Sequence, residues 1–242
     1  MDHSIDIAVA DGSFAALVVR PDHVRPGPAP VVVVLQEIFG VNPGIRSIAH
    51  ELAGHGFIAV CPDLFWRSER GLSMDESNPK HQERGFALYG AYDFDQGVAD
   101  VVATIAAARV LDGASGKVGV MGFCLGGLLT FLTAATGATD AAVAYYGGGT
   151  ERFLERAGGL HTPLLMHLAE EDEYIGKDAQ AAIRAAVADR SGVTVHGYPG
   201  QSHAFARPGG AHFDQASADL ANGRTLAFLQ TVLSNLRKAN HR

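Results

Sequence analysis

The sequence is poor in cysteine: Cys61 and Cys124 are the only two in 242 residues. A small secreted scaffold built on disulfide bonds uses more of them. The first residues also lack the basic and apolar segments of a secretory signal. No apolar run reaches the ~18 residues that suggest a membrane helix. We therefore expect a cytoplasmic protein that does not associate with a membrane.

The sequence also lacks an excess of positive charge. It has 19 Lys and Arg against 26 Asp and Glu, a formal net charge of -7. Nucleic acids and anionic membranes need a basic face, so neither is an expected partner. An anionic substrate would need a specific arginine. With 47% apolar and 19% charged residues, we expect residues 1–242 to form a single globular domain.

Strands and helices alternate along most of the chain. Apolar β-branched runs such as Val31 to Leu35 indicate buried strands, and capped periodic segments indicate helices. We expect a hairpin over 4–20 that turns at Asp11-Gly12, strands at 31–35, 57–61, 117–122, 141–146, 163–169 and 193–198, and helices at 42–54, 92–109, 125–136, 176–190 and 214–238. Residues 62–90 are the least regular segment. This order predicts an α/β fold with a mostly parallel, doubly wound sheet.

The most specific motif is Gly122-Phe123-Cys124-Leu125-Gly126-Gly127. It has the form G-x-nucleophile-x-G between an expected strand and an expected helix, the context that supports a nucleophile elbow. The turn would hold Cys124 at a helix N-terminus, where the dipole favours the thiolate. The Leu125 N–H would be free to face an oxyanion. The alternative is a buried structural thiol, which is how we interpret Cys61.

A cysteine nucleophile needs a base and an orienting acid. Of eleven histidines, His203 follows the strand at 193–198 and is the last before the closing helix, the place of the base in this architecture. The acid should follow the strand at 163–169, where four candidates stand: Glu170, Glu171, Asp172 and Glu173. The residues alone do not decide among the four.

The sequence resembles the dienelactone hydrolase (carboxymethylenebutenolidase) family, which has the α/β-hydrolase fold. The resemblance extends from about Val31 to Phe228. It includes Gln36-Glu37-Ile38-Phe39-Gly40, the elbow, Ala144-Tyr145-Tyr146-Gly147, Glu171-Asp172, His203-Ala204-Phe205-Ala206-Arg207 and Arg224-Thr225-Leu226. It implies a triad of Cys124, His203 and Asp172, and an oxyanion hole formed by the N–H groups of Ile38 and Leu125.

The resemblance also implies roles for residues around the triad. Glu37 would lie beside the Cys124 thiol and restrain it until substrate binds. Arg207 would clamp a substrate carboxylate, a match that the guanidinium fork makes bidentately. Tyr146 would be one of the substrate-binding residues.

The substrate-binding segment departs from the family pattern. Gln82 stands near the place of a second carboxylate-binding arginine, with Arg84 close by. Phe86 and Tyr89 stand at the neighbouring aromatic positions, and Ala204 replaces the usual serine. These changes concern the substrate rather than the scissile chemistry.

The sequence thus predicts a cysteine hydrolase that opens a carboxylate-bearing lactone through a thioester, without cofactor or metal. A small-molecule ester or lactone is the expected partner, and a monomer the expected state, with a dimer as the alternative. Two other functions remain open: a broader carboxylesterase or other lactonase, and an inactive binding or thiol-redox module on the same fold.

Overall fold

The computed structural model describes residues 2–21 and 27–233. Its eight strands form one sheet in the order β1-β2-β4-β3-β5-β6-β7-β8. The strands are β1 (His3–Val9), β2 (Gly12–Val19), β3 (Ala29–Leu35), β4 (Ile58–Pro62), β5 (Ala114–Phe123), β6 (Ala141–Tyr145), β7 (Leu164–Ala169) and β8 (Val193–Tyr198). β1 and β2 form the expected antiparallel hairpin, which joins the sheet antiparallel to β4. All the remaining pairings are parallel, so the prediction of a mostly parallel sheet is confirmed.

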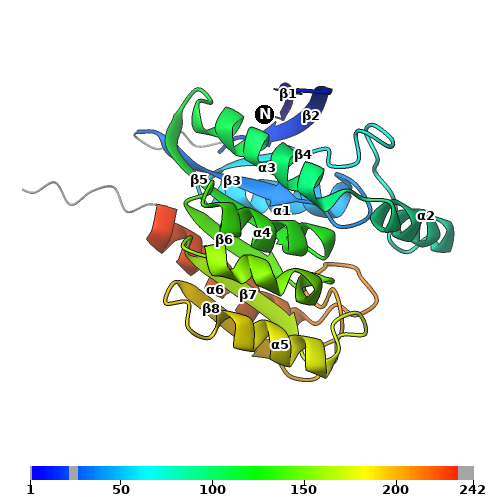
Figure 1. Cartoon of the computed structure of the whole chain (residues 1–242). Helices are drawn as coiled ribbons and strands as arrows, with labels where there is room; N and C mark the ends of the chain where they lie inside the picture. The colour runs from blue at the N-terminus through cyan, green and yellow to red at the C-terminus, as the bar shows by residue number, and fades with distance from the viewer. Residues whose placement is uncertain (1, 22–26, 234–242) are drawn as a thin grey trace, which may run out of the picture.

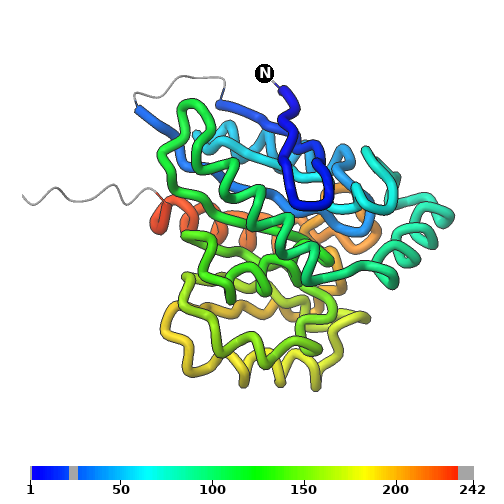
Figure 2. Tube along the Cα trace, turned by 45° about the horizontal axis from the view of Figure 1, so that its top comes forward, coloured from blue at the N-terminus to red at the C-terminus, as the bar shows by residue number. Residues whose placement is uncertain are grey.

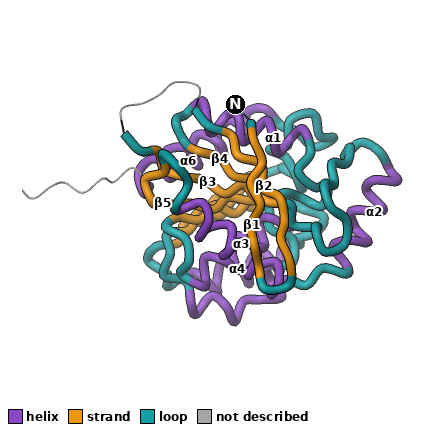
Figure 3. Tube along the Cα trace, turned by 90° about the horizontal axis from the view of Figure 1, so that it is seen from above, coloured by secondary structure: helices purple, strands orange, loops and turns teal. Residues whose placement is uncertain are grey.

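Helices cover both faces of the sheet (Figure 1). They are α1 (Pro43–Gly54), α2 (Pro79–Gly90), α3 (Phe94–Arg109), α4 (Leu125–Thr136), α5 (Lys177–Val187) and α6 (Gln215–Leu233), together with the 3₁₀ helix η1 (Thr150–Gly159). Buried residues of α1 and α6 pack against one face. Those of α3, α4 and α5 pack against the other. In the view along the sheet the two helix layers lie on opposite sides of the strands (Figure 3).

Local chemistry sets the element ends where the sequence predicted them. The Asn42 side chain accepts a hydrogen bond from the Ile45 N–H at 3.1 Å, and Pro43 occupies the first helical position of α1, as expected for a capped start. The valines of β3 are fully buried, because helices cover this strand on both faces. None of the described helices combines the length and apolarity needed to cross a bilayer.

The structure differs from the prediction in two segments. Residues 62–90, expected to be irregular, contain the helix α2, which projects from the end of the sheet (Figures 1 and 3). The glycine-rich turn after β6 leads into η1, which the sequence pattern did not indicate. Residues 234–238 of the expected closing helix lie outside the described residues. Figure 2 shows the N-terminal hairpin and α5 at opposite ends of the sheet.

The topology changes direction between β3 and β5. The chain passes outward from β3 to β4 and returns to place β5 on the other side of β3. In open α/β sheets, ligands bind beyond the carboxyl ends of the strands at such a switch point. The segments that follow β3 and β5 are the QEIFG motif and the cysteine elbow.

Three glycines allow α4 to approach the strand ends at this point. A Cβ atom on Gly126 would lie 2.5 Å from the Leu35 carbonyl oxygen, and one on Gly127 would lie 2.3 Å from that of Tyr145. A Cβ on Gly122 would lie 2.2 Å from the Gly126 carbonyl oxygen. These neighbours are backbone atoms, so no rotamer change could relieve the contacts.

We expect Gly126→Ala to destabilise the fold by at least ~1–3 kcal/mol, the usual cost of overpacking. Gly223 is the matched control, because it also lies in a helix and a Cβ there meets nothing within 4 Å. Gly223→Ala should leave stability unchanged or raise it by up to about 1 kcal/mol. Urea denaturation of both variants measures the difference, and equal stabilities would contradict the argument.

Candidate active site

The candidate site lies along the carboxyl edge of five adjacent parallel strands. Glu37 follows β3, Cys124 follows β5, and Tyr146 follows β6. Asp172 follows β7 and His203 follows β8. Residues far apart in the sequence therefore meet at one edge, because parallel strands end there together.

Cys124 stands between β5 and α4 with φ 53° and ψ -114°. This is a strained conformation for a residue with a Cβ. Hydrogen bonds on both sides hold it: its N–H donates to the Tyr145 carbonyl at 3.1 Å, and its carbonyl accepts from Leu128 at 3.1 Å. The side chain is partly exposed and lies at the N-terminus of α4. The elbow predicted from the sequence is therefore present in the backbone geometry.

Two backbone amides near Cys124 are available for an oxyanion. Within the described ranges, neither the Ile38 N–H nor the Leu125 N–H donates a hydrogen bond to a protein acceptor. The Ile38 loop is held by α2: a Cβ on Gly85 would lie only 2.9 Å from the Ile38 carbonyl oxygen. Ile38 also lines the same pocket as Cys124.

The His203 ring is oriented by Asp172. His203 Nδ1 lies 2.9 Å from Asp172 Oδ2, and both side chains are buried. The other carboxylate oxygen of Asp172 accepts hydrogen bonds from the N–H groups of Tyr174 and Ile175, at 2.8 and 3.2 Å. With Nδ1 directed at the carboxylate, Nε2 is the nitrogen that remains for another group. In the described part of the chain Nε2 is buried without a hydrogen-bond partner.

The charge state of His203 depends on Cys124. Burial alone lowers the pKa of His203, but Cys124 and the hydrogen bond to Asp172 outweigh it and raise the pKa to about 10. The sulfur and the imidazole are thus electrostatically coupled across the pocket that both of them line.

The other three acids after β7 make different contacts. Glu171 pairs with Lys177 at 2.6 Å. Glu173 accepts a hydrogen bond from the His203 backbone N–H at 3.1 Å rather than from its ring. For Glu170 the contact is made by the backbone: its carbonyl oxygen accepts a hydrogen bond from the Gln180 side-chain amide at 3.4 Å. Of these four neighbouring acids, Asp172 is the one whose carboxylate meets the imidazole.

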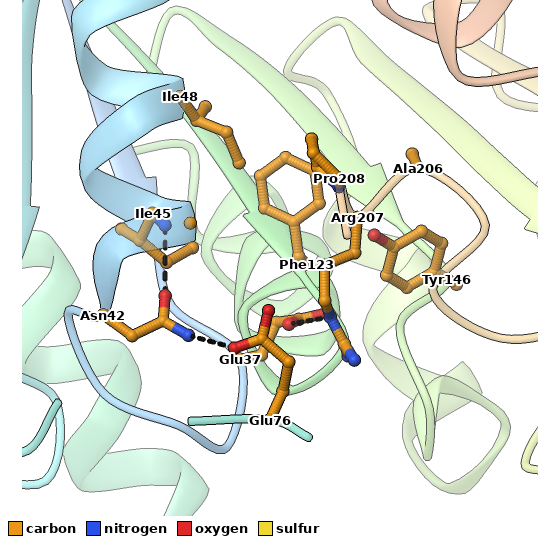
Figure 4. A pocket seen from close by; sticks show the side chains of 11 residues that line it. Glu37, Asn42, Ile45, Ile48, Glu76, Phe123, Tyr146, Ala206, Arg207 and Pro208 are labelled. Atoms are coloured by element: carbon orange, nitrogen blue, oxygen red, sulfur yellow. Dashed lines mark hydrogen bonds and ion pairs between the residues drawn. The ribbon is translucent and has the colours of Figure 1, made fainter. Parts of the chain in front are cut away.

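Glu37 and Arg207 are paired with each other. Arg207 Nε and Nη2 donate to the two Glu37 carboxylate oxygens at 2.7 and 2.9 Å (Figure 4). No hydrogen bond joins Glu37 to Cys124 in the described residues; the carboxylate is instead paired with Arg207. The reason is electrostatic, since a buried carboxylate gains far more from a guanidinium fork than from a thiol. Burial alone lowers the pKa of Arg207, but Glu37 more than reverses the effect.

Tyr146 lies beside the candidate site rather than in the lining of its large pocket. It is fully buried, and its φ is 36°. Its ring packs edge-on against His203, with centroids 5.0 Å apart. Its hydroxyl has no hydrogen-bond partner among the described residues. Tyr146 lines a cavity of about 20 Å³ together with Glu37 and Arg207 (Figure 4). Tyr146 therefore packs against the His203 ring and is not part of the lining of the large pocket that contains Cys124.

Cys124 opens onto a pocket of about 930 Å³. One face of α2 forms a wall of this pocket through Gln82, Phe86 and Tyr89. Arg84 is not part of the lining and pairs with Glu69 at 2.9 Å on the surface. Arg84, which stands close to Gln82 in the sequence, is therefore not placed to act as the second carboxylate-binding arginine. The Gln82 amide donates to the Glu76 carbonyl at 2.8 Å.

The sequence interpretation did not single out two further side chains of this pocket. The Tyr174 ring packs against His203 and against Phe86, with ring centroids 4.8 and 5.8 Å apart respectively. Arg152 enters the lining from η1. Their positions in the sequence could have indicated a place near the site, because Tyr174 follows β7 and Arg152 follows β6 at the edge of the sheet where the site lies. In the described ranges, no cluster of three or more His, Cys, Asp or Glu side chains has the arrangement of a metal site.

Comparisons with known proteins agree with this geometry. The model of the "dienelactone hydrolase family" matches residues 14–233. A carboxymethylenebutenolidase of Pseudomonas putida is 38% identical, with 97% of this chain and 98% of that protein covered. A candidate carboxymethylenebutenolidase of Azospirillum brasilense is 43% identical, with 92% and 95% covered.

Structural similarity agrees with the sequence similarity. The crystal structure of a candidate dienelactone hydrolase from Klebsiella pneumoniae superposes with a TM-score of 0.81 at 29% identity. That superposition covers 94% of this chain and 97% of the other. The chain is therefore a hydrolase with the α/β-hydrolase fold and belongs to the dienelactone hydrolase family.

Proposed function

We propose that this hydrolase uses Cys124 as a nucleophile to open a carboxylate-bearing lactone through a thioester. The observation that carries the proposal is the meeting of three elements. Cys124 stands in a strained turn at a helix N-terminus, His203 shares its pocket, and Asp172 fixes the His203 ring at 2.9 Å. A structural thiol such as Cys61, whose pKa burial raises to about 12, has none of these partners.

In the first half of the reaction, the Cys124 thiolate attacks the acyl carbon. The carbonyl oxygen becomes an oxyanion that accepts hydrogen bonds from the Ile38 and Leu125 N–H groups. When the tetrahedral intermediate collapses, the bond between the acyl carbon and the ring oxygen breaks. The leaving oxygen takes the proton of the His203 imidazolium and departs as an enol, which leaves His203 neutral for the second half.

In the second half, water hydrolyses the thioester. Neutral His203 accepts a proton from the water as its oxygen attacks the acyl carbon, and the carbon–sulfur bond then breaks. Asp172 keeps Nδ1 protonated and so directs Nε2 toward the water. The leaving oxygen of a lactone stays tethered to the acyl group, so one ring-opened product leaves the pocket.

A broader carboxylesterase or lactonase is the second candidate. Three observations favour it. Gln82 is uncharged, and Arg84 points away from the pocket. Arg207 already uses Nε and Nη2 to bind Glu37, so these two donors are not free for a substrate carboxylate. The comparison that separates the candidates is kcat/KM for the carboxymethylene butenolide acid against its methyl ester. A preference for the acid supports the first candidate, and equal or reversed values support the second.

The nucleophile assignment predicts that Cys124→Ala abolishes hydrolysis without unfolding the protein. Cys124→Ser should be much slower than wild type, since a hydroxyl is far harder to ionise than a thiol. Cys61→Ala is the control and should keep activity, although the loss of a buried side chain lowers its stability. Steady-state turnover and circular dichroism measure both effects. Near wild-type turnover in Cys124→Ala would reject the nucleophile.

The assignment of the acid predicts that Asp172→Asn lowers kcat strongly, on the order of 10⁴-fold by analogy with other triads. An amide in place of the carboxylate favours the wrong tautomer of His203 and removes the charge beside it. Glu171→Gln is the matched control, because its carboxylate meets Lys177 rather than His203. If Glu171→Gln lost activity while Asp172→Asn kept it, Glu171 rather than Asp172 would be the acid that orients His203.

The coupling of His203 to Cys124 predicts a change in titration. The His203 pKa of about 10 should fall in Cys124→Ala, because the contribution of Cys124 that raises it is lost while burial, which favours the neutral ring, remains. The imidazole should therefore lose its charge at a lower pH than in wild type. NMR titration of the ring measures this, with Cys61→Ala as control. An unchanged His203 pKa in Cys124→Ala would show that the two groups are not coupled.

A further inference from the structure

Two arginines line the large pocket, and they differ in their availability. Arg207 directs Nε and Nη2 at the Glu37 carboxylate, so its charge is largely balanced within the protein. The Arg152 side chain forms no ion pair with any carboxylate among the described residues; it is exposed, lines the pocket and lies beside the Tyr89 hydroxyl. A substrate anion therefore meets, at Arg152, a cation whose charge no carboxylate of the described residues balances.

Arg152 is held beside Tyr89 by the turn that follows β6. The Tyr89 hydroxyl donates to the Gly148 carbonyl at 3.1 Å. A Cβ on Gly149, which has φ 90° and directly precedes η1, would lie 2.7 Å from that hydroxyl oxygen. Burial raises the pKa of Tyr89, Cys124 adds to the shift, and Arg152 opposes it. The phenol is therefore within electrostatic reach of both the sulfur and the guanidinium.

Aromatic side chains limit where the guanidinium lies. Arg152 Cζ is 5.7 Å from the ring centroids of both Phe94 and Phe153. Contacts over ring faces restrict the side chain without using its N–H donors. The donors remain for a ligand, as the recognition of a carboxylate requires.

We propose that Arg152 and Tyr89 form an anion subsite of the active-site pocket and supply the positive charge that is absent at Gln82. The proposal rests on the proposed function, since it takes the ligand to be a substrate carboxylate. Arg152 approaches from η1, on the sheet face covered by α4 and α5. Arg207 packs near Ile45 and Ile48 of α1, on the other face. A substrate carboxylate held by Arg152 would leave the Glu37–Arg207 pair intact.

Glu151 provides an opposing charge next to this subsite. Its carboxylate lines the same pocket, and its Oε2 atom is buried without a hydrogen-bond partner among the described residues. Glu151 also contributes to the raised pKa of Tyr89. A bound anion would be repelled by Glu151, so removing that charge should strengthen binding at the subsite.

The test compares the carboxymethylene butenolide acid with its methyl ester, following the loss of the lactone chromophore. Arg152→Gln should raise KM for the acid about tenfold or more, with little change in kcat and none in kcat/KM for the ester. Glu151→Gln should lower KM for the acid. Gln82→Arg should restore KM in the Arg152→Gln background.

Arg156→Gln is the matched control. Arg156 lies on the same 3₁₀ helix, is exposed, and pairs with Asp95 at 3.2 Å outside the pocket. Its loss changes the net charge of the protein equally but should leave both substrates unaffected. Equal losses for acid and ester in Arg152→Gln, or identical behaviour of the Arg152 and Arg156 variants, would overturn the subsite.

A binding measurement keeps this proposal separate from the catalytic one. Calorimetric titration of the acid into Cys124→Ala should show binding that Arg152→Gln weakens about tenfold. If wild type opens neither lactone but this difference is found, the subsite is supported and the proposed reaction fails. If wild type opens the acid and binding does not depend on Arg152, the subsite fails and the reaction is supported.

Discussion

The contact between backbones at the start of α4 is the constraint on which the rest of the site depends. A Cβ on Gly126 would lie 2.5 Å from the end of β3, and one on Gly127 would lie 2.3 Å from the end of β6. Only this close approach places the helix N-terminus at the switch point of the sheet. The turn then has to bring Cys124 to a positive φ. The strain at Cys124 is thus a consequence of packing, and the many buried contacts of α4 compensate for it.

A second consequence concerns charge at the same edge. Glu37 follows β3 and is therefore carried toward Cys124, yet a buried carboxylate requires a strong partner. Arg207 provides it through two hydrogen bonds. Removing one partner of such a pair leaves the other charged and buried, which costs several kcal/mol. Any ligand that drew Arg207 away would have to compensate Glu37 in turn, so a carboxylate substrate gains less from Arg207 than the isolated side chain suggests.

The sequence predicts positions along the sheet better than it predicts the directions of side chains. Strand patterns placed Cys124 and His203 at one edge, because parallel strands end together whatever their loops contain. The choice of Asp172 among four consecutive acids came from family resemblance, because loop geometry rather than composition directs one carboxylate to the imidazole. The pairing of Glu37 with Arg207 joins residues 170 positions apart, and no local pattern encodes which of two nearby groups a buried carboxylate selects.

The helix α2 shows how an unrecognised element changes the interpretation of a substrate pocket. With 3.6 residues per turn, positions 82, 86 and 89 share one face, while position 84 is rotated about 200° from position 82. Gln82, Phe86 and Tyr89 accordingly line the pocket, and Arg84 pairs with Glu69 on the surface. Proximity in sequence could not give Arg84 the role of a missing arginine once its segment was helical. A replacement charge has to come from an element that faces α2 across the pocket. The 3₁₀ helix η1 meets that condition, because the Gly148 carbonyl in the turn before it accepts a hydrogen bond from the Tyr89 hydroxyl of α2.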